Sequence, residues 1–101
     1  MKSKTIAIQG DSLNKLNPKT DTTIFLAIEA QKRNYKVFYY EPNNLYIKNN
    51  EVYAKGFYVK FHYSKKDYYK IISKKNLKLD KAKIILIRQD PPFNLQYIIT
   101  T

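Results

Sequence analysis

The chain alternates between short stretches of hydrophobic, often β-branched residues and longer polar connections. Alternation of apolar and polar positions is typical of a half-buried strand, because successive side chains in a strand point to opposite faces. Residues 83–87 (KIILI) are nearly all apolar, which predicts a strand buried on both faces. The pattern predicts further strands at residues 5–9, 36–40, 45–48, 51–55 and 57–62.

One segment has helical spacing instead. Residues 22–34 place apolar side chains three and four positions apart, which predicts an amphipathic helix capped by Thr20 or Asp21. Asn34 can adopt the left-handed conformation that often ends a helix. The inner face of this helix is expected to consist of Ile24, Ala27, Ile28 and Gln31.

Connections between these elements have recognisable turn chemistry. Asn49-Asn50 suits a two-residue hairpin between strands, residues 41–44 (EPNN) suit a turn, and Gly56 is expected to break the strand pattern. Residues 63–76 are polar and rich in lysine, and a short helix is expected there. Its apolar anchors would be Tyr68, Ile71 and Ile72.

A helix between two strands indicates a βαβ unit, in which the two strands run parallel. A further helix is expected to begin at Leu95, after the last strand. The sequence therefore predicts an α/β fold: a small, open, parallel-dominated sheet with flanking helices and a short β-hairpin. Residues 1–101 have the length of a single domain, and the pattern breaks off at Thr101 as in a fragment of a longer protein.

Composition narrows the class of protein. The chain has no cysteine, which excludes disulfides, thiol nucleophiles and zinc-thiolate sites. It has no apolar run long enough to span a membrane and no signal-peptide pattern at its start, so the sequence predicts a cytoplasmic protein with no membrane partner.

The formal net charge of +11 points toward nucleic acid as a partner. Nearly all of this charge comes from lysine, whereas base recognition and bidentate phosphate contacts favour arginine. Arg33 and Arg88 are the two arginines, and the lysines are spread along the chain. We therefore expect a solvated lysine surface and no nucleic-acid partner.

Candidate functional residues follow two of the predicted strands. In an open α/β sheet, ligands bind at the carboxyl ends of the strands, where Asp11 and Arg88 are expected to lie. Arg88 could hold a carboxylate, with Asp90 on the same side of the chain; alternatively, the two pair with each other or cap a neighbouring helix. Asp11 is either a cap or a substrate contact. Gly10 is expected to serve a turn that needs a positive φ.

The sequence contains no recognisable catalytic or cofactor-binding motif. It has no phosphate-binding glycine loop, no metal-ligand cluster, no carboxylate pair and no nucleophile triad. His62 is the single histidine and lies on a predicted strand, where a structural or exposed role is expected. We assign no catalytic residue and no metal ligand to these residues.

The segment that begins at Arg88 carries a resemblance to a known family. IRQDPPFN is similar to the R-x-D-P-P-F-(D/N) segment of bacterial glutathione synthetases, near the end of their N-terminal domain. Further matching positions are Asp11, Asn17, Lys19, Asp21, Thr22, Thr23, Glu29, Ala30, Gln31, Arg33, Tyr35, Leu45, Tyr46 and Ala54. Asn34, Asn44 and Asn94 depart from the family pattern, and residues 57–79 show no family motif.

The resemblance implies properties that the residues alone do not. Members of this family are ATP-grasp ligases that join γ-glutamylcysteine to glycine with ATP and Mg²⁺, through an acyl phosphate. The N-terminal part is a Rossmann-like, pre-ATP-grasp domain that forms one wall of the substrate cleft, so this chain alone is expected to be inactive. The resemblance places Arg88 and Asp90 at that cleft. It also implies that four further motif residues have structural roles: Asp21, Pro91, Pro92 and Phe93.

Two alternatives remain open at this point. The chain could belong to another amino-acid or peptide ligase with the same type of N-terminal domain, because one fold serves many functions. It could also be a basic nucleic-acid-binding module. The resemblance further leaves open a homo-oligomer of the full-length enzyme.

Overall fold

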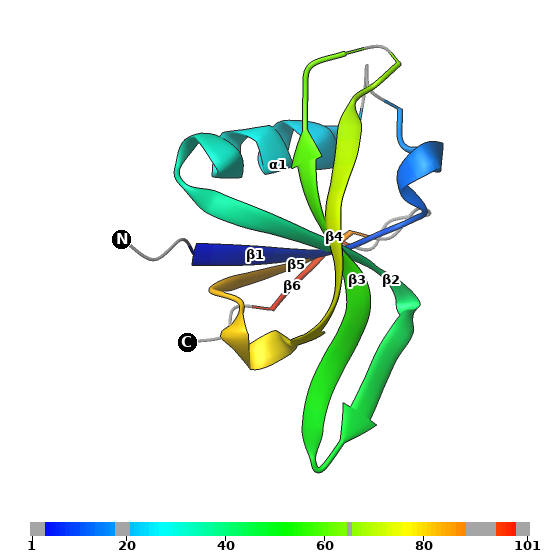
Figure 1. Cartoon of the computed structure of the whole chain (residues 1–101), viewed down its shortest axis with the longest axis vertical. Coiled ribbons are helices and arrows are strands. Elements are labelled where there is room, and N and C mark those ends of the chain that lie inside the picture. The colour runs from blue at the N-terminus through cyan, green and yellow to red at the C-terminus, as the bar shows by residue number, and fades with distance from the viewer. Residues whose placement is uncertain (1–3, 18–20, 65, 89–94, 99–101) are drawn as a thin grey trace.

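The computed structural model describes residues 4–17, 21–64, 66–88 and 95–98. A twisted sheet forms the centre of the fold, one α-helix lies against it, and a long hairpin extends away from it (Figure 1). The elements in chain order are β1 (Lys4–Gln9), the 3₁₀ helix η1 (Leu13–Lys15), α1 (Thr22–Lys32), β2 (Tyr35–Lys48), β3 (Glu51–Phe61), β4 (Tyr69–Lys78), the 3₁₀ helix η2 (Leu79–Lys81), β5 (Ile84–Arg88) and β6 (Leu95–Ile98).

The sheet has six strands in the order β4-β3-β2-β1-β5-β6. β1 pairs in parallel with β2 on one side and with β5 on the other, as the βαβ pattern predicted. The α/β class and the parallel centre of the open sheet are thus confirmed. Antiparallel strands continue the sheet on both sides, β3 and β4 beyond β2, and β6 beyond β5, so the whole sheet is mixed.

Helix α1 forms where the spacing predicted it. The Asp21 carboxylate accepts a hydrogen bond of 2.9 Å from the Thr23 backbone N–H, which satisfies one of the free donors at the start of the helix. The helix ends before Asn34, whose φ of 67° is the predicted left-handed stop. Its buried face includes Ile24, Ala27 and Ile28, three of the four residues expected there.

Apolar side chains fill both faces of the sheet. On the first face, the side chains of α1 pack on alternate residues of β1, β2 and β3, such as Ile8, Val37 and Val59. On the second face, η2 and the end of β4 cover a smaller cluster. Its buried members are Ala7, Phe38, Tyr40, Ala54, Leu77, Leu79, Ala82 and Ile85.

The hairpin is longer than the sequence pattern predicted. β2 runs through the predicted turn at residues 41–44, and a register shift between Tyr40 and Leu45 takes up the extra residues as a bulge. β3 likewise runs through Gly56, because this glycine lets the backbones approach: an added Cβ would lie 2.4 Å from the Tyr39 carbonyl oxygen. The predicted turn and break are therefore wrong. The two-residue hairpin turn at Asn49-Asn50 is confirmed, with φ angles of 54° and 63°.

Two predicted helices are strands in the structure. The segment that includes Tyr69–Lys78 is β4, which pairs with the otherwise open edge of β3. Tyr68 is buried as an anchor, but Ile71 and Ile72 are exposed on the edge strand. The segment from Leu95 to Ile98 is β6, which pairs with the open edge of β5. Both corrections have one cause: a free strand edge offers backbone hydrogen bonds that local helical spacing does not reveal.

No helix within the described ranges is both long enough and apolar enough to cross a membrane.

Candidate functional site

The carboxyl ends of β1 and β5 lie at one edge of the parallel part of the sheet, beside the point where β2 continues into the hairpin. Gln9, at the end of β1, lies in register with Tyr40 on β2 and Ile87 on β5. The next residue on each strand therefore emerges at the same place, which brings Glu41 and Arg88 to either side of Gly10. This edge is the position where open α/β sheets bind ligands.

Gly10 is required by contact and not by a turn. It does not have a positive φ, so the prediction of a left-handed glycine is wrong. A Cβ on residue 10 would lie 2.4 Å from the Tyr39 hydroxyl and 3.2 Å from the Arg88 carbonyl oxygen. Because Gly10 has no side chain, the chain can leave the end of β1 directly between β2 and β5. The Gly10 N–H donates a hydrogen bond to the Tyr40 carbonyl at 3.1 Å.

Two tyrosine hydroxyls hold the loop that follows Gly10. The Tyr39 hydroxyl donates to the Asp11 carbonyl at 2.6 Å, and the Tyr68 hydroxyl donates to the Leu13 carbonyl at 2.5 Å. The loop is tied to the middle of β2 as well, because the Ser12 hydroxyl donates to Glu41 Oε1 at 3.2 Å. Three separate hydrogen bonds thus fix the first turn after β1.

The surroundings of both tyrosines at this edge disfavour their ionisation. Burial raises the pKa of Tyr39 well above its usual value, and the carboxylates of Asp21, Asp11 and Glu41 raise it further. Burial is also the main cause of a raised pKa at Tyr68. The two hydroxyls therefore remain hydrogen-bond donors to the loop at neutral pH and into the alkaline range. The carboxylates that affect Tyr39 also make this edge locally acidic in a chain of strongly positive net charge.

A hollow of about 270 Å³ lies beside the loop. Ser12, Asn14 and Glu41 contribute polar groups to it, and Lys55 contributes a cation from β3. Aromatic side chains, among them Tyr39 and Tyr69, contribute apolar walls. A concave surface with apolar walls and a few polar groups has the character of a small-ligand site.

The structure describes the positions of two of the three residues predicted to contact substrate. Asp11 is exposed at the start of the loop, and its backbone carbonyl accepts the hydrogen bond from the Tyr39 hydroxyl. Arg88 is half-buried at the end of β5 and forms no ion pair with the residues that the structure describes. Asp90 lies outside the described residues, as do Pro91, Pro92 and Phe93.

Two other predicted residues have clear places. Asp21 caps α1 and so has the structural role expected of it. His62 is exposed just after β3, and its N–H donates to the Tyr68 carbonyl at 2.8 Å, which agrees with a structural position.

Sequence reasoning missed Glu41 as a site residue. It directly follows residues 36–40, so the rule that selected Asp11 and Arg88 would have selected it too. The predicted turn at residues 41–44 hid this signal. The partnership of Ser12 with Glu41 had no signal in the sequence, because the two residues lie 29 positions apart.

The donor set of the described residues does not suit a metal ion. Within the part of the chain that the structure describes, no group of three histidine, aspartate or glutamate side chains is placed to bind one. The carboxylates near Tyr39 are committed in part to capping α1 and to the Ser12 contact.

Comparison with known proteins identifies relatives for nearly the whole chain. Residues 5–101 match the family model described as prokaryotic glutathione synthetase, N-terminal domain. The chain is 36% identical over 100 residues to the glutathione synthetase of Buchnera aphidicola subsp. Schizaphis graminum, covering 99% of this chain and 31% of that protein. It is 35% identical over 96 residues to the glutathione synthetase of Mesorhizobium japonicum, covering 95% of this chain and 31% of that protein.

The match covers only part of each of these relatives. The chain spans about a third of their length, 31% in both cases. The matched region includes β1, α1 and β5, the elements that form the carboxyl edge of the sheet and pack beside it. The chain therefore belongs to the family of the prokaryotic glutathione synthetase N-terminal domain.

Proposed function

We propose that this chain is the substrate-cleft domain of a glutathione synthetase that joins γ-glutamylcysteine to glycine with cleavage of ATP to ADP and phosphate. The observation that carries the proposal is the match over residues 5–101 to the N-terminal domain of that enzyme. We place the enzyme in the cytoplasm, where ATP is available. We also propose that it binds neither nucleic acid nor a membrane.

The carboxyl edge of the sheet supplies the chemistry for the peptide substrate. γ-Glutamylcysteine carries two carboxylates and one ammonium group. Arg88 stands at this edge as a half-buried cation without an ion-pair partner among the described residues, so its guanidinium is available to hold a carboxylate in a two-pronged contact. Asp90 would orient that guanidinium, and Asp11, exposed on the same edge, would face the substrate.

ATP and Mg²⁺ belong to the part of the ligase that these residues do not span. The described carboxylates do not form a metal-ligand group, and the sequence has no glycine-rich phosphate loop. The role of residues 1–101 is then to bind and orient the peptide, not to activate it. The isolated chain should therefore have no ligase activity.

Two measurements test the proposal that residues 1–101 bind the peptide and that the rest of the ligase binds ATP and Mg²⁺. In a full-length ligase that contains this domain, ADP formation should require both γ-glutamylcysteine and glycine, and a different amino acid or peptide requirement would favour another ligase of the same architecture. Calorimetric titration of residues 1–101 with Mg-ATP should give no micromolar binding. A micromolar site would contradict the assignment of the nucleotide to the rest of the enzyme.

A further inference from the structure

Four lysines form a row across the sheet at the amino ends of the parallel strands. Lys70 on β4 lies opposite Lys60 on β3. Lys60 follows Val59 and Lys36 precedes Val37. Because Val59 lies opposite Val37 in the antiparallel pair, Lys60 and Lys36 face each other across β3 and β2. Lys36 lies opposite Thr5, whose carbonyl accepts a hydrogen bond of 2.8 Å from the N–H of Lys83. The row thus runs over β4, β3 and β2 and, beyond Thr5 on β1, ends at Lys83 directly before β5.

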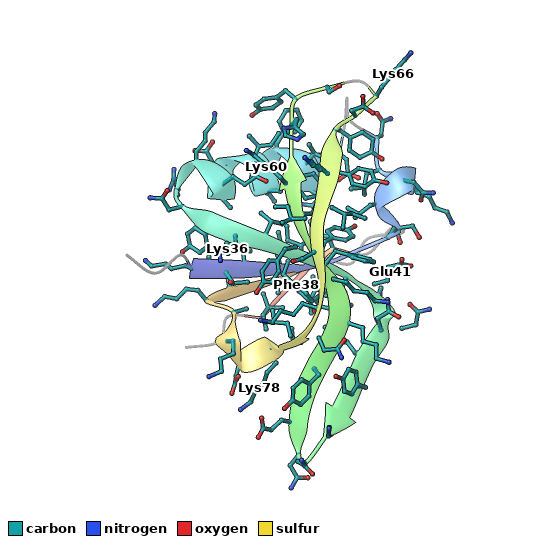
Figure 2. All side chains as sticks on the ribbon, in the orientation of Figure 1. Lys36, Phe38, Glu41, Lys60, Lys66 and Lys78 are labelled. Carbon is teal, nitrogen blue, oxygen red and sulfur yellow. The ribbon has the colours of Figure 1, made fainter. Side chains whose placement is uncertain are left out.

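The four side chains share the face opposite α1. Val37 and Val59 pack under α1, so their neighbours Lys36 and Lys60 point to the other face, because side chains alternate along a strand. All four lysines are exposed. Lys36 and Lys60 lie on the opposite side of the molecule from Glu41, which marks the candidate substrate edge (Figure 2). The row is therefore separate from that site.

Among the described residues, no ion pair balances the charge of these lysines, and the strand segments that carry Lys36, Lys60 and Lys70 supply no carboxylate. Residues 35–40, 52–61 and 69–79 contain no aspartate or glutamate. The ion pairs of the described residues involve Lys32, Arg33 and Lys78, none of which belongs to the row. Like charges placed directly opposite each other on neighbouring strands are destabilising. The bare sheet therefore carries a cost that an anionic partner would relieve.

Protection of a sheet edge does not account for the row. Lysines on an edge strand prevent unwanted pairing with other chains, which explains Lys70 on β4. Lys60 and Lys36 are on inner strands with both edges paired, where such protection has no use. Their positions need another explanation.

The surface around the row can also receive an apolar group. A hollow of about 330 Å³ is lined by Lys36, Lys60, Tyr58, Ile72 and Ser73, among other residues. Ile72 is 62% exposed, and Tyr58 presents an aromatic ring with Lys75 about 6.0 Å from its centroid. Cations and apolar groups thus alternate on this face.

We propose that the lysine row docks an α-helix from outside residues 1–101 that carries a line of carboxylates and adjacent apolar side chains. Neighbouring strands place Lys70, Lys60 and Lys36 about 4.8 Å apart in succession, and Thr5 on β1 separates Lys36 from Lys83 by about twice that spacing. Carboxylates on successive turns of a helix repeat about every 5.4 Å, which is close to the spacing of the lysines. A nucleic acid fits less well, because the row has no arginine for bidentate phosphate contacts. This inference does not depend on the proposed function.

The test is a binding titration of residues 1–101 with a fluorescent, alanine-based helical peptide. The peptide carries glutamates at i, i+4, i+7 and i+11, and leucines beside them. Binding should be saturable and should weaken as salt is raised, because exposed charges are screened. Lys36→Gln and Lys60→Gln should each weaken it by roughly two- to fivefold, in the range of exposed charge pairs.

The matched control is Lys74→Gln, which removes the same charge from β4 but on the helix-covered side of the sheet, opposite Phe57. It should leave peptide binding unchanged. The proposal is overturned if the glutamine version of the peptide binds equally well, if Lys74→Gln weakens binding as much as Lys60→Gln, or if a poly(U) oligonucleotide of equal charge binds more tightly than the peptide.

A second measurement needs no partner. If the lysines of the row repel one another, Lys60→Gln should raise the melting temperature of the free chain at low salt, and the gain should disappear at high salt. Lys74→Gln should show no such salt-dependent gain. An equal gain in melting temperature in both variants would show that the lysines of the row repel one another no more than other lysines of the sheet do.

Discussion

The side-chain amide of Gln31 on α1 pairs with the backbone of Phe61 at the end of β3. Gln31 Nε2 donates to the Phe61 carbonyl at 3.0 Å, and the Phe61 N–H donates to Gln31 Oε1 at 2.7 Å. One side chain thereby satisfies both backbone groups of a residue whose own side chain is buried. The pair fixes α1 to the antiparallel part of the sheet, 30 residues further along the chain.

Replacement of Gln31 should be costly for this reason. Gln31→Leu would leave the Phe61 N–H and carbonyl without their partner, so we expect a loss of about 1–3 kcal/mol in the free energy of unfolding. Urea denaturation of the purified chain measures it. Lys32→Ala, at the exposed neighbouring position, serves as the control and should change stability by less than about 0.5 kcal/mol. Equal stability of Gln31→Leu and the unmodified chain would show that the two hydrogen bonds contribute nothing.

Gly10 and Tyr39 should behave as a coupled pair. Gly10→Ala would place a methyl group against the Tyr39 hydroxyl and should destabilise the chain by about 1–3 kcal/mol. Tyr39→Phe alone should cost about 1 kcal/mol, because it removes the hydrogen bond to the Asp11 carbonyl.

The double variant Gly10→Ala with Tyr39→Phe separates steric contact from other effects. Removal of the hydroxyl oxygen takes away the closest clashing atom, so the double variant should lose less stability than the sum of the two single changes, by about 1 kcal/mol. Additive losses would place the strain of Gly10→Ala elsewhere, at the Arg88 carbonyl oxygen 3.2 Å from the added Cβ.

Tyr40 should make stability depend on pH under alkaline conditions. Burial raises its pKa to about 12 from a usual value of 10.0. The unfolded chain loses the Tyr40 proton at lower pH than the folded chain does, so this contribution to stability is complete below pH 10 and is lost as the pH rises toward 12. The lysines also titrate in this range, so the comparison must be made between variants.

The relevant variant is Tyr40→Phe, with Tyr63→Phe as the control at a position that is 63% exposed. Urea denaturation at pH 9 and pH 11 should show that Tyr40→Phe loses less stability over this interval than the unmodified chain, by about 1 kcal/mol. Tyr63→Phe should follow the unmodified chain. If all three chains lose the same amount, ionisation of Tyr40 does not contribute to alkaline unfolding.

The parts of the fold that the sequence predicted are those set by neighbouring residues. Helix α1 has its cap at Asp21, its apolar spacing and its left-handed stop at Asn34 within one short segment, so its bounds were predicted closely. The hairpin turn at Asn49-Asn50 is local in the same way. The three central strands followed from hydrophobic runs and from the helix between the first two.

The parts that the sequence did not predict depend on contacts between distant segments. β4 and β6 exist because they pair with the edges of β3 and β5, and their own residues do not indicate those partners. At the site, the Tyr68 hydroxyl reaches the Leu13 carbonyl across 55 residues. The positions of Arg88 and Asp11 at the ends of β5 and β1 could be predicted because the rule for parallel strands applies to any such sheet, and their contact with substrate stays a prediction.

Arg88 provides the sharpest test of the proposed function. If its guanidinium holds a carboxylate of the peptide substrate, Arg88→Lys in the full-length ligase should lower kcat/KM for γ-glutamylcysteine by roughly tenfold or more. The reason is geometric: lysine keeps the charge but lacks the planar fork that binds both carboxylate oxygens. The loss corresponds to about 1.5–3 kcal/mol, the range of a hydrogen bond to a charged group.

Melting temperature distinguishes this role from a structural one. A substrate-binding Arg88 is not needed for folding, so Arg88→Lys should leave the melting temperature nearly unchanged. Arg33→Lys is the matched control, because Arg33 is exposed on the helix and pairs with Glu29 at 3.4 Å, away from the edge; it should change neither quantity. If Arg88→Lys instead lowers the melting temperature and leaves the kinetics intact, Arg88 serves the fold, and a different residue at the carboxyl edge must hold the substrate.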